Sequence, residues 1–139
     1  MVVRVKLKVE VGGKSFEVIA IANAGYESLT PQILLPRNVA RRLGLWPPPK
    51  EAEELTYRTA GGPLRVWVLP RGAKVSVVAE DRSSSEVECD IVISPLTGEA
   101  LISDKLIDAL DIVLEAPGRG LWRFRDDPPD KVRQSVQPR

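Results

Sequence analysis

The chain has 139 residues, enough for one domain with its own hydrophobic core. Hydrophobic residues make up 43% and charged residues 28%, a composition typical of soluble globular proteins and not of disordered or fibrous ones. The net charge of +1 provides no overall field that would favour nucleic acid or an anionic membrane as a partner.

Two features of the composition restrict the chemistry. The chain has no histidine, which excludes Ser-His-Asp and Cys-His mechanisms and every histidine-based metal site. The single cysteine, Cys89, cannot form an intrachain disulfide, and its place in an alternating apolar stretch predicts a buried side chain. We therefore expect neither a metal ion nor a cofactor.

The sequence carries no sign of membrane insertion or export. No apolar run approaches the roughly 20 residues of a membrane span, and the N-terminus lacks the uninterrupted apolar stretch of a signal peptide. We expect a cytoplasmic protein. Asn and Gln are scarce while Arg, Glu and Pro are common, which favours a heat-stable protein.

The first third of the chain predicts a hairpin followed by a helix. Apolar and charged residues alternate from Val3 to Val11, the pattern of a strand with one solvated face. Gly12-Gly13 supplies a tight turn, and the segment from Ser15 to Ala22 predicts the returning strand. Pro36 can open a short helix that stops at Gly44.

Two further hairpins are predicted in the middle of the chain. The first runs from Leu55 to Leu69, with Ala60-Gly61-Gly62-Pro63 at its tip. The second joins a strand from Lys74 to Ala79 to a strand from Glu86 to Ile93, around a polar turn.

A second helix and two short strands are predicted near the C-terminus. Ser103 is the predicted N-cap of the helix, and Asp104 places a negative charge in its first turn. The segment from Ile112 to Phe124 predicts two short strands around a Pro-Gly turn. From Arg125 onward the chain is polar and Pro-rich, so we expect a domain over residues 1–124 and a frayed tail over 125–139.

This order of elements predicts an all-β fold, a small closed or partly open barrel with two short helices. Hairpin, loop and helix occur twice, over residues 3–44 and 74–111, with a flap-like hairpin between them. The order resembles that of the retropepsin-like aspartic proteases, and the resemblance spans residues 3–124. The segments that carry it are AIANAG (20–25), VARRLGL (39–45), YRTAGGPLRVWV (57–68) and ALISDKLIDALDIVLEAPGRGLWRF (100–124).

The resemblance implies a catalytic site whose residues are replaced in this chain. The family's Asp-Thr/Ser-Gly motif corresponds here to Asn23, Ala24 and Gly25, and Ser103 stands where the second apolar-apolar-Gly motif has its glycine. Each subunit of a retropepsin contributes one Asp to a pair that shares a proton and activates water. An amide cannot serve as that general base, so no intact catalytic residue is expected.

Other carboxylates are poor substitutes for the missing base. Glu27 lies close to the motif, where the resemblance implies the wall of the substrate groove. Displacement of a catalytic acid by about 1 Å can cost roughly a hundredfold in rate, so Glu27 is a poor substitute. Asp90 is interpreted as a solvent-facing strand residue, and Asp104 as a charge in the first turn of a helix. We therefore favour a non-catalytic protein.

The resemblance also implies a homodimer, because one copy supplies only half of a retropepsin-type groove. The flap residues would be Ala60, Gly61 and Gly62. Leu121, Trp122 and Phe124 are predicted at the dimer interface, since two large aromatics on one face of a terminal strand are costly to leave in water, on the order of 2 kcal/mol or more each.

The predicted function is binding by an inactivated aspartic-protease-like homodimer, with an extended peptide or protein segment in the groove between subunits. One alternative is a working aspartic endopeptidase, if Asn23 stands in place of a native Asp or is tolerated by the reaction. The other is a structural or interaction subunit whose groove is closed by side chains. No nucleic acid or membrane is expected as a partner.

Overall fold

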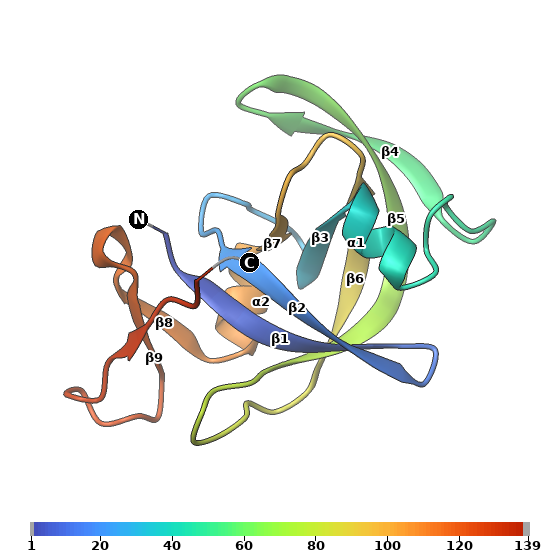
Figure 1. Ribbon diagram of the computed structural model, residues 1–139. Coiled ribbons are helices and arrows are strands. Elements are labelled where there is room, and N and C mark those ends of the chain that lie inside the picture. Colours follow the sequence, from blue (N-terminus) through green and yellow to red (C-terminus); the bar gives the residue numbers. More distant parts are fainter. Residues whose placement is uncertain (1, 138–139) are drawn as a thin grey trace.

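The computed structural model describes residues 2–137 and contains a closed β-barrel (Figure 1). Its elements are β1 (Arg4–Val11), β2 (Lys14–Ala22), β3 (Gln32–Pro36), α1 (Arg37–Arg42), β4 (Glu53–Thr59), β5 (Gly62–Val77), β6 (Val87–Ser94), β7 (Ala100–Ile102), α2 (Asp104–Ala109), β8 (Ile112–Ala116), η1 (Pro117–Arg119, a 3-10 turn), β9 (Leu121–Phe124) and β10 (Arg133–Gln134). The barrel strands follow the order β1-β2-β7-β3-β6-β5, and β5 pairs with β1 to close it. The predicted mostly β barrel with two short helices is confirmed.

The first hairpin forms as predicted and lines the barrel. β1 pairs antiparallel with β2, so that Val5 lies opposite Ala20 with both side chains buried. Gly12 and Gly13 take positive φ angles of 57° and 82°, a conformation that favours glycine, and they form the turn. Each aliphatic side chain that this alternation buries contributes about 1.5–3 kcal/mol relative to leaving it in water.

The second and third hairpins share one long strand, β5, where the sequence predicted two separate strands. The register between β5 and β6 shifts between Leu69 and Ala73. At the shift Arg71 has a φ of 51°, and its N–H donates to Asp90 Oδ1 at 2.8 Å. A β-bulge of this kind bends a strand without ending it, which explains why the turn-like segment Pro70-Arg71-Gly72 lies within β5.

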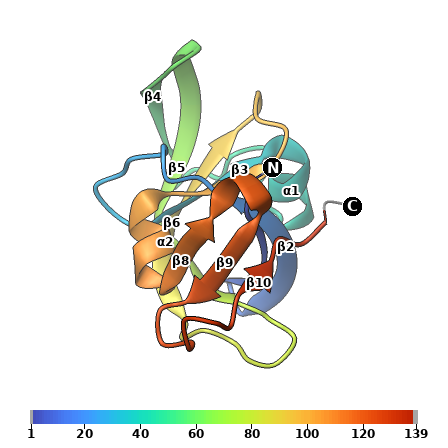
Figure 2. The same cartoon turned by 90° about the vertical axis from the view of Figure 1, so that its left-hand side faces the viewer.

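A second apolar cluster lies on the opposite face of the sheet from the barrel core. Its buried members come from β3, β5 and β6, and they are Leu34, Val66, Val68 and Val92. Tyr26 and Tyr57 pack against this second cluster. Tyr57 belongs to β4, so the cluster fixes the β4–β5 hairpin to the barrel while the rest of the hairpin projects beyond it (Figure 2).

Both helices form where the sequence predicted them. α1 begins after Pro36 and ends before Gly44, whose φ of 75° suits a residue that follows a helix. α2 begins after Ser103, whose Oγ accepts the N–H of Leu106 at 3.3 Å, so Ser103 is confirmed as the N-cap. Neither helix, nor any other helix in the described part of the chain, is long and apolar enough to cross a membrane.

The expectation of a frayed tail is wrong for residues 125–137. β10 lies in this segment and pairs antiparallel with β9, with Arg133 opposite Trp122. β8, β9 and β10 form a three-stranded sheet that faces the viewer in Figure 2. Residues 138 and 139, which also belong to the predicted tail, lie outside the described residues.

Ion pairs hold this segment to the barrel. We call the residues that form them, Asp81, Asp127 and Arg133, the C-terminal clasp. The Arg133 guanidinium donates to both carboxylates, including a bond from its Nε to Asp127 Oδ2 at 3.0 Å. The same Asp127 oxygen accepts the N–H of Phe124 at 2.8 Å. The hydrogen bonds from Arg133 lower the pKa of both carboxylates, more strongly that of Asp81.

The aromatic residues predicted at a dimer interface are buried within their own chain. Trp122 is 3% exposed and Phe124 is fully buried, and their rings meet edge-on with centroids 5.1 Å apart. The Arg82 guanidinium lies 4.3 Å from the centroid of the Phe124 ring, and Leu121 is half-buried. A second copy is therefore not needed to cover these side chains, and that argument for a dimer is wrong.

Candidate functional site

Asn23 uses its side-chain oxygen to hold the shape of its own loop. Its Oδ1 accepts the N–H of Gly25 at 3.0 Å, and its main-chain oxygen accepts the N–H of Tyr26 at 3.0 Å. Its own N–H donates to the oxygen of Ile102 at 3.2 Å. A Cβ atom on Gly25 would lie 3.3 Å from Asn23 Oδ1, so a side chain there would require this oxygen to shift slightly. Ala24 and Gly25 are exposed.

Ser103 joins the start of α2 to the start of β3. Its Oγ accepts the N–H of Gln32 at 3.0 Å in addition to that of Leu106, and its own N–H donates to the oxygen of Gln32 at 3.0 Å. Ser103 is fully buried, so both bonds form away from water. The predicted N-cap serine thus also has a structural role in holding β3.

Asp104 ties the Asn23 loop to the same helix end. Its Oδ1 accepts the N–H of Ser28 at 3.1 Å and that of Lys105 at 2.7 Å, while its own N–H donates to the oxygen of Tyr26 at 2.9 Å. The prediction of a carboxylate in the first turn of a helix is confirmed. Its hydrogen bonds give it a second, positioning role that the sequence did not reveal.

Gln32 connects the Asn23 loop to the β4–β5 hairpin, and no pattern in the sequence predicted this role. Its Oε1 accepts the hydroxyl of Tyr26 at 2.7 Å and the hydroxyl of Tyr57 at 3.3 Å. Burial raises the pKa of both phenols above their ordinary value, so both remain neutral donors. We call Tyr26, Gln32 and Tyr57 the tyrosine bridge.

Asp90 is a strand residue, as predicted, but its side chain makes hydrogen bonds to two other segments. It is half-buried, and its two oxygens accept the hydroxyl of Thr30 and the N–H of Arg71. Asp90 thereby holds the end of the Asn23 loop against the bulge in β5. Because alternation along a strand does not report a bulge on its neighbour, this role could not be read from the sequence.

The predicted groove and flap residues are accessible. Glu27 is exposed and forms no hydrogen bond or ion pair within residues 2–137. Ala60 and Gly61 form the exposed hairpin turn, and Gly62 opens β5 with a φ of 110°. Leu29, in the loop that carries Asn23, is 97% exposed.

The described residues contain no grouping suited to a metal ion or a reactive thiol. No cluster of three or more His, Cys, Asp or Glu side chains that could hold a metal occurs between residues 2 and 137. Cys89 is buried, as predicted, and desolvation raises the pKa of its thiol to about 12. A thiol in this state is a poor nucleophile.

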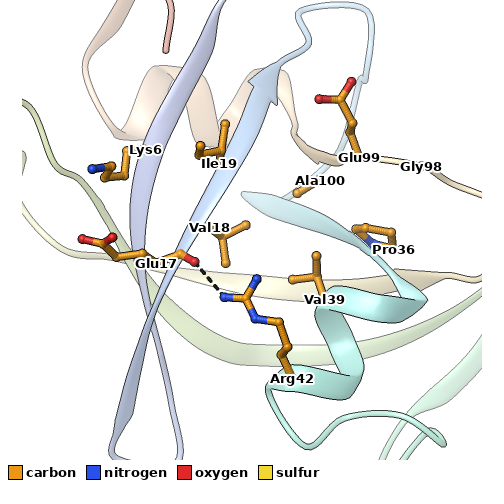
Figure 3. Close-up of a pocket in the computed structure, with 10 residues that line it drawn as sticks. All are labelled: Lys6, Glu17, Val18, Ile19, Pro36, Val39, Arg42, Gly98, Glu99 and Ala100. Atoms are coloured by element: carbon orange, nitrogen blue, oxygen red, sulfur yellow. Dashed lines mark hydrogen bonds between the residues drawn. The ribbon is translucent and has the colours of Figure 1, made fainter. Parts of the chain in front are cut away.

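A cavity of about 240 Å³ lies elsewhere on the barrel, and the sequence did not point to it (Figure 3). Its walls come from β1, β2, the end of β3, α1 and the segment that leads into β7, and no residue of the Asn23 loop takes part. Arg42 crosses one side and donates to the main-chain oxygen of Glu17 at 3.1 Å. Basic and acidic side chains alternate around the opening, so the cavity favours no single class of ligand.

β2 and β7 run parallel, so Asn23 and Ser103 follow neighbouring strand ends although they lie far apart in the sequence. Hydrogen bonds to Tyr26, Ser28 and Gln32 then lock the two loops together.

Searches of protein-family models and of curated proteins find no match to this chain.

Proposed function

We propose that this protein is a non-catalytic, aspartic-protease-like homodimer that binds an extended peptide or protein segment in a groove between its copies. One observation carries the proposal. At the position where the family resemblance implies the catalytic Asp, Asn23 has an amide whose oxygen is already used by the N–H of Gly25. An amide has no proton to give up in the pH range of life, so it cannot activate water.

Nearby carboxylates are also committed to structural bonds. Asp90 accepts hydrogen bonds from Thr30 and Arg71, and Asp104 accepts them from Ser28 and Lys105. A general base must reach the proton that it removes, and these groups would have to release their present partners first. Glu27 is free of such bonds but is held by a loop and not by the strand end that carries Asn23.

The binding part of the proposal draws on the exposed surface around the Asn23 loop. Leu29 presents an almost fully exposed apolar side chain there, and the β4–β5 hairpin projects beyond the barrel (Figures 1 and 2). An extended segment that lies against a strand gains main-chain hydrogen bonds, while exposed side chains of the loop provide selectivity. This mode of binding requires no catalytic residue.

The catalytic part is tested by cleavage of a denatured protein between about pH 3 and 6, where carboxylates titrate. The unaltered chain is expected to show no turnover, Asn23→Asp slight turnover, and Asn23→Asp with Ala24→Thr more. Acid-dependent turnover by the unaltered chain that Asn23→Ala abolishes would refute the proposal. No gain from the double substitution would show that the groove is not protease-like.

The binding part is tested with capped peptides of alternating Val and Thr, which favour an extended conformation. We expect saturable binding by calorimetry and a dimer by light scattering at high micromolar concentration. Leu29→Ser, a change of a fully exposed side chain, should weaken binding without lowering stability, and the exposed Leu96→Ser serves as the matched control. A monomer, or equal effects of the two variants, would contradict the proposed groove.

A structural subunit with a closed groove is the second candidate, and the tyrosine bridge favours it. Tyr26 and Tyr57 fill space between the Asn23 loop and the hairpin and meet at Gln32. If these side chains close the groove, Tyr57→Ala should create binding of the capped peptide that the unaltered chain lacks. If the groove is open, the same substitution should weaken binding or leave it unchanged.

A further inference from the structure

β4 is an edge strand whose backbone is interrupted by no proline and no bulge. It lies at the end of the seven-stranded sheet and, among the described residues, pairs only with β5. Its seven residues, EELTYRT, contain no proline, glycine or lysine, the residues that commonly interrupt or blunt an edge. Six of the seven are exposed, and only Tyr57 is partly buried. Such an edge is a ready template for another strand.

A proline on β5 reveals which main-chain groups of β4 point to the free edge. Pro63 lies opposite Arg58 and has no N–H, so these two residues cannot form a hydrogen-bonded pair. Hydrogen-bonded and non-hydrogen-bonded pairs alternate along an antiparallel ladder. Thr56 and Glu54 therefore also direct their N–H and C=O groups away from β5. Three residues of β4 thus offer unpaired donors and acceptors along one edge.

We infer that this edge binds the β4 strand of a second copy of the chain, antiparallel and centred on Thr56. In that register the two Thr56 residues face each other across a two-fold axis, and each Glu54 lies opposite Arg58 of the second copy. All three positions are those whose main-chain groups point outward, so each pair can exchange two hydrogen bonds. The interface is isologous, as a two-fold contact requires.

The charges of β4 select this register over its neighbours. Centring the pair on Arg58 would place two guanidinium groups opposite each other, and centring it on Glu54 would do the same for two carboxylates, both of which are destabilising. Arg58 forms no ion pair within residues 2–137, so its charge is available. Glu54 is paired with Arg65 in its own chain and can accept from a second guanidinium with its exposed oxygens.

The other face of β4 gains apolar contact in the same register. Leu55 is 38% exposed, and pairing centred on Thr56 places it opposite Tyr57 of the second copy. Tyr57 already packs against the second apolar cluster, so that cluster would become continuous across the axis. Opposite pairs of an aromatic and an aliphatic residue stabilise a sheet by about 0.2–1 kcal/mol.

This contact stands apart from the proposed function. It does not involve the Asn23 loop, so a result against catalysis leaves the β4 contact untouched. Because both proposals predict a dimer, the crosslink at Thr56, and not light scattering, distinguishes the β4 contact from a groove between copies.

A cysteine at the two-fold axis provides the first test. Opposite residues of a hydrogen-bonded pair have Cα atoms about 5.5 Å apart, within the range of a disulfide. Under mild oxidation Thr56→Cys should give a covalent dimer, while the matched Thr59→Cys, exposed on the same strand but about 20 Å from its own copy, should not. The native Cys89 is buried and adds little background. Equal crosslinking of the two variants, or none in Thr56→Cys, would overturn the inference.

A charge exchange provides the second test, in the Thr56→Cys background. Glu54→Arg and Arg58→Glu should each lower the crosslinking rate about tenfold, because each places like charges opposite each other twice across the axis. The double substitution should restore most of the rate. Failure of the double variant to recover would refute the register. If an added capped peptide protected the β4 amides from hydrogen exchange while no crosslink formed, the edge would belong to an extended ligand and not to a second copy.

Discussion

Removal of the Asp127 carboxylate should destabilise the fold more than any neighbouring surface change. The side chain of Asp127 is only 4% exposed, and it accepts hydrogen bonds from Phe124 N–H and from Arg133. In Asp127→Ala the buried N–H of Phe124 loses its acceptor, which costs about 1–3 kcal/mol. Arg133 also loses one of its two carboxylate partners but keeps Asp81. The loss of this ion pair therefore costs less than the roughly 3–5 kcal/mol of a fully broken buried pair. We expect a total loss of about 3 kcal/mol.

Asp126 supplies a matched control, because it is the adjacent aspartate and also pairs with an arginine. Its side chain is 71% exposed, and its contact with Arg82 at 2.9 Å is a surface ion pair. Asp126→Ala should therefore cost no more than about 0.5 kcal/mol. The two variants thus delete carboxylates from adjacent positions, one of them exposed and the other buried.

Urea unfolding followed by circular dichroism measures both losses on the same scale. For a chain of this size, 3 kcal/mol corresponds to a fall in Tm of about 10 °C. If Asp127→Ala loses less than about 1 kcal/mol, or no more than Asp126→Ala, the C-terminal clasp does not hold the segment after Phe124. The frayed tail expected from composition would then be the better description.

Three further outcomes follow from the same contacts. The bonds to Arg133 lower the folded-state pKa of Asp127 below its ordinary value of 3.8. The clasp therefore stabilises the fold above about pH 4, and this stabilisation is lost as the pH falls through the lowered pKa. Urea unfolding at pH 7 and at pH 3 should show that Asp127→Asn loses less stability on acidification than the unaltered chain. Tyr57→Phe removes the hydroxyl bonded to Gln32 and should speed hydrogen exchange in β4 about threefold, with no change in β1. Ser103→Ala leaves two backbone N–H groups without their acceptor and should cost about 2 kcal/mol by urea unfolding, whereas the exposed Ser83→Ala should cost under about 0.5 kcal/mol.

Local signals in the sequence were sufficient for most of the elements. The alternation from Val3 to Val11, the glycine turn and the N-cap Ser103 each act within a few residues, and each was confirmed. The long-range closure of the barrel through β1 and β5 follows from the same alternation only after the hairpins are placed side by side. The sequence does not state which strands become neighbours.

The predictions from the sequence were wrong where the same local composition is compatible with two different structures. Pro70-Arg71-Gly72 has the composition of a turn, and Asp90 from a neighbouring strand converts it into a bulge. The polar segment after Phe124 has the composition of a tail, and partners as distant as Asp81 order it. In both cases the deciding contact joins residues far apart in the sequence, which composition cannot report.

The geometry of the Asn23 loop allows Asn23→Asp to be tested without a change in the shape of the loop. The loop uses only the side-chain oxygen of Asn23, which accepts from Gly25, while its amide nitrogen has no partner among residues 2–137. A carboxylate retains that acceptor and gains a charge that favours the same N–H donor. Asn23→Asp should therefore leave the loop in place and change stability by less than about 1 kcal/mol. An absence of turnover in that variant could then not be ascribed to a displaced loop.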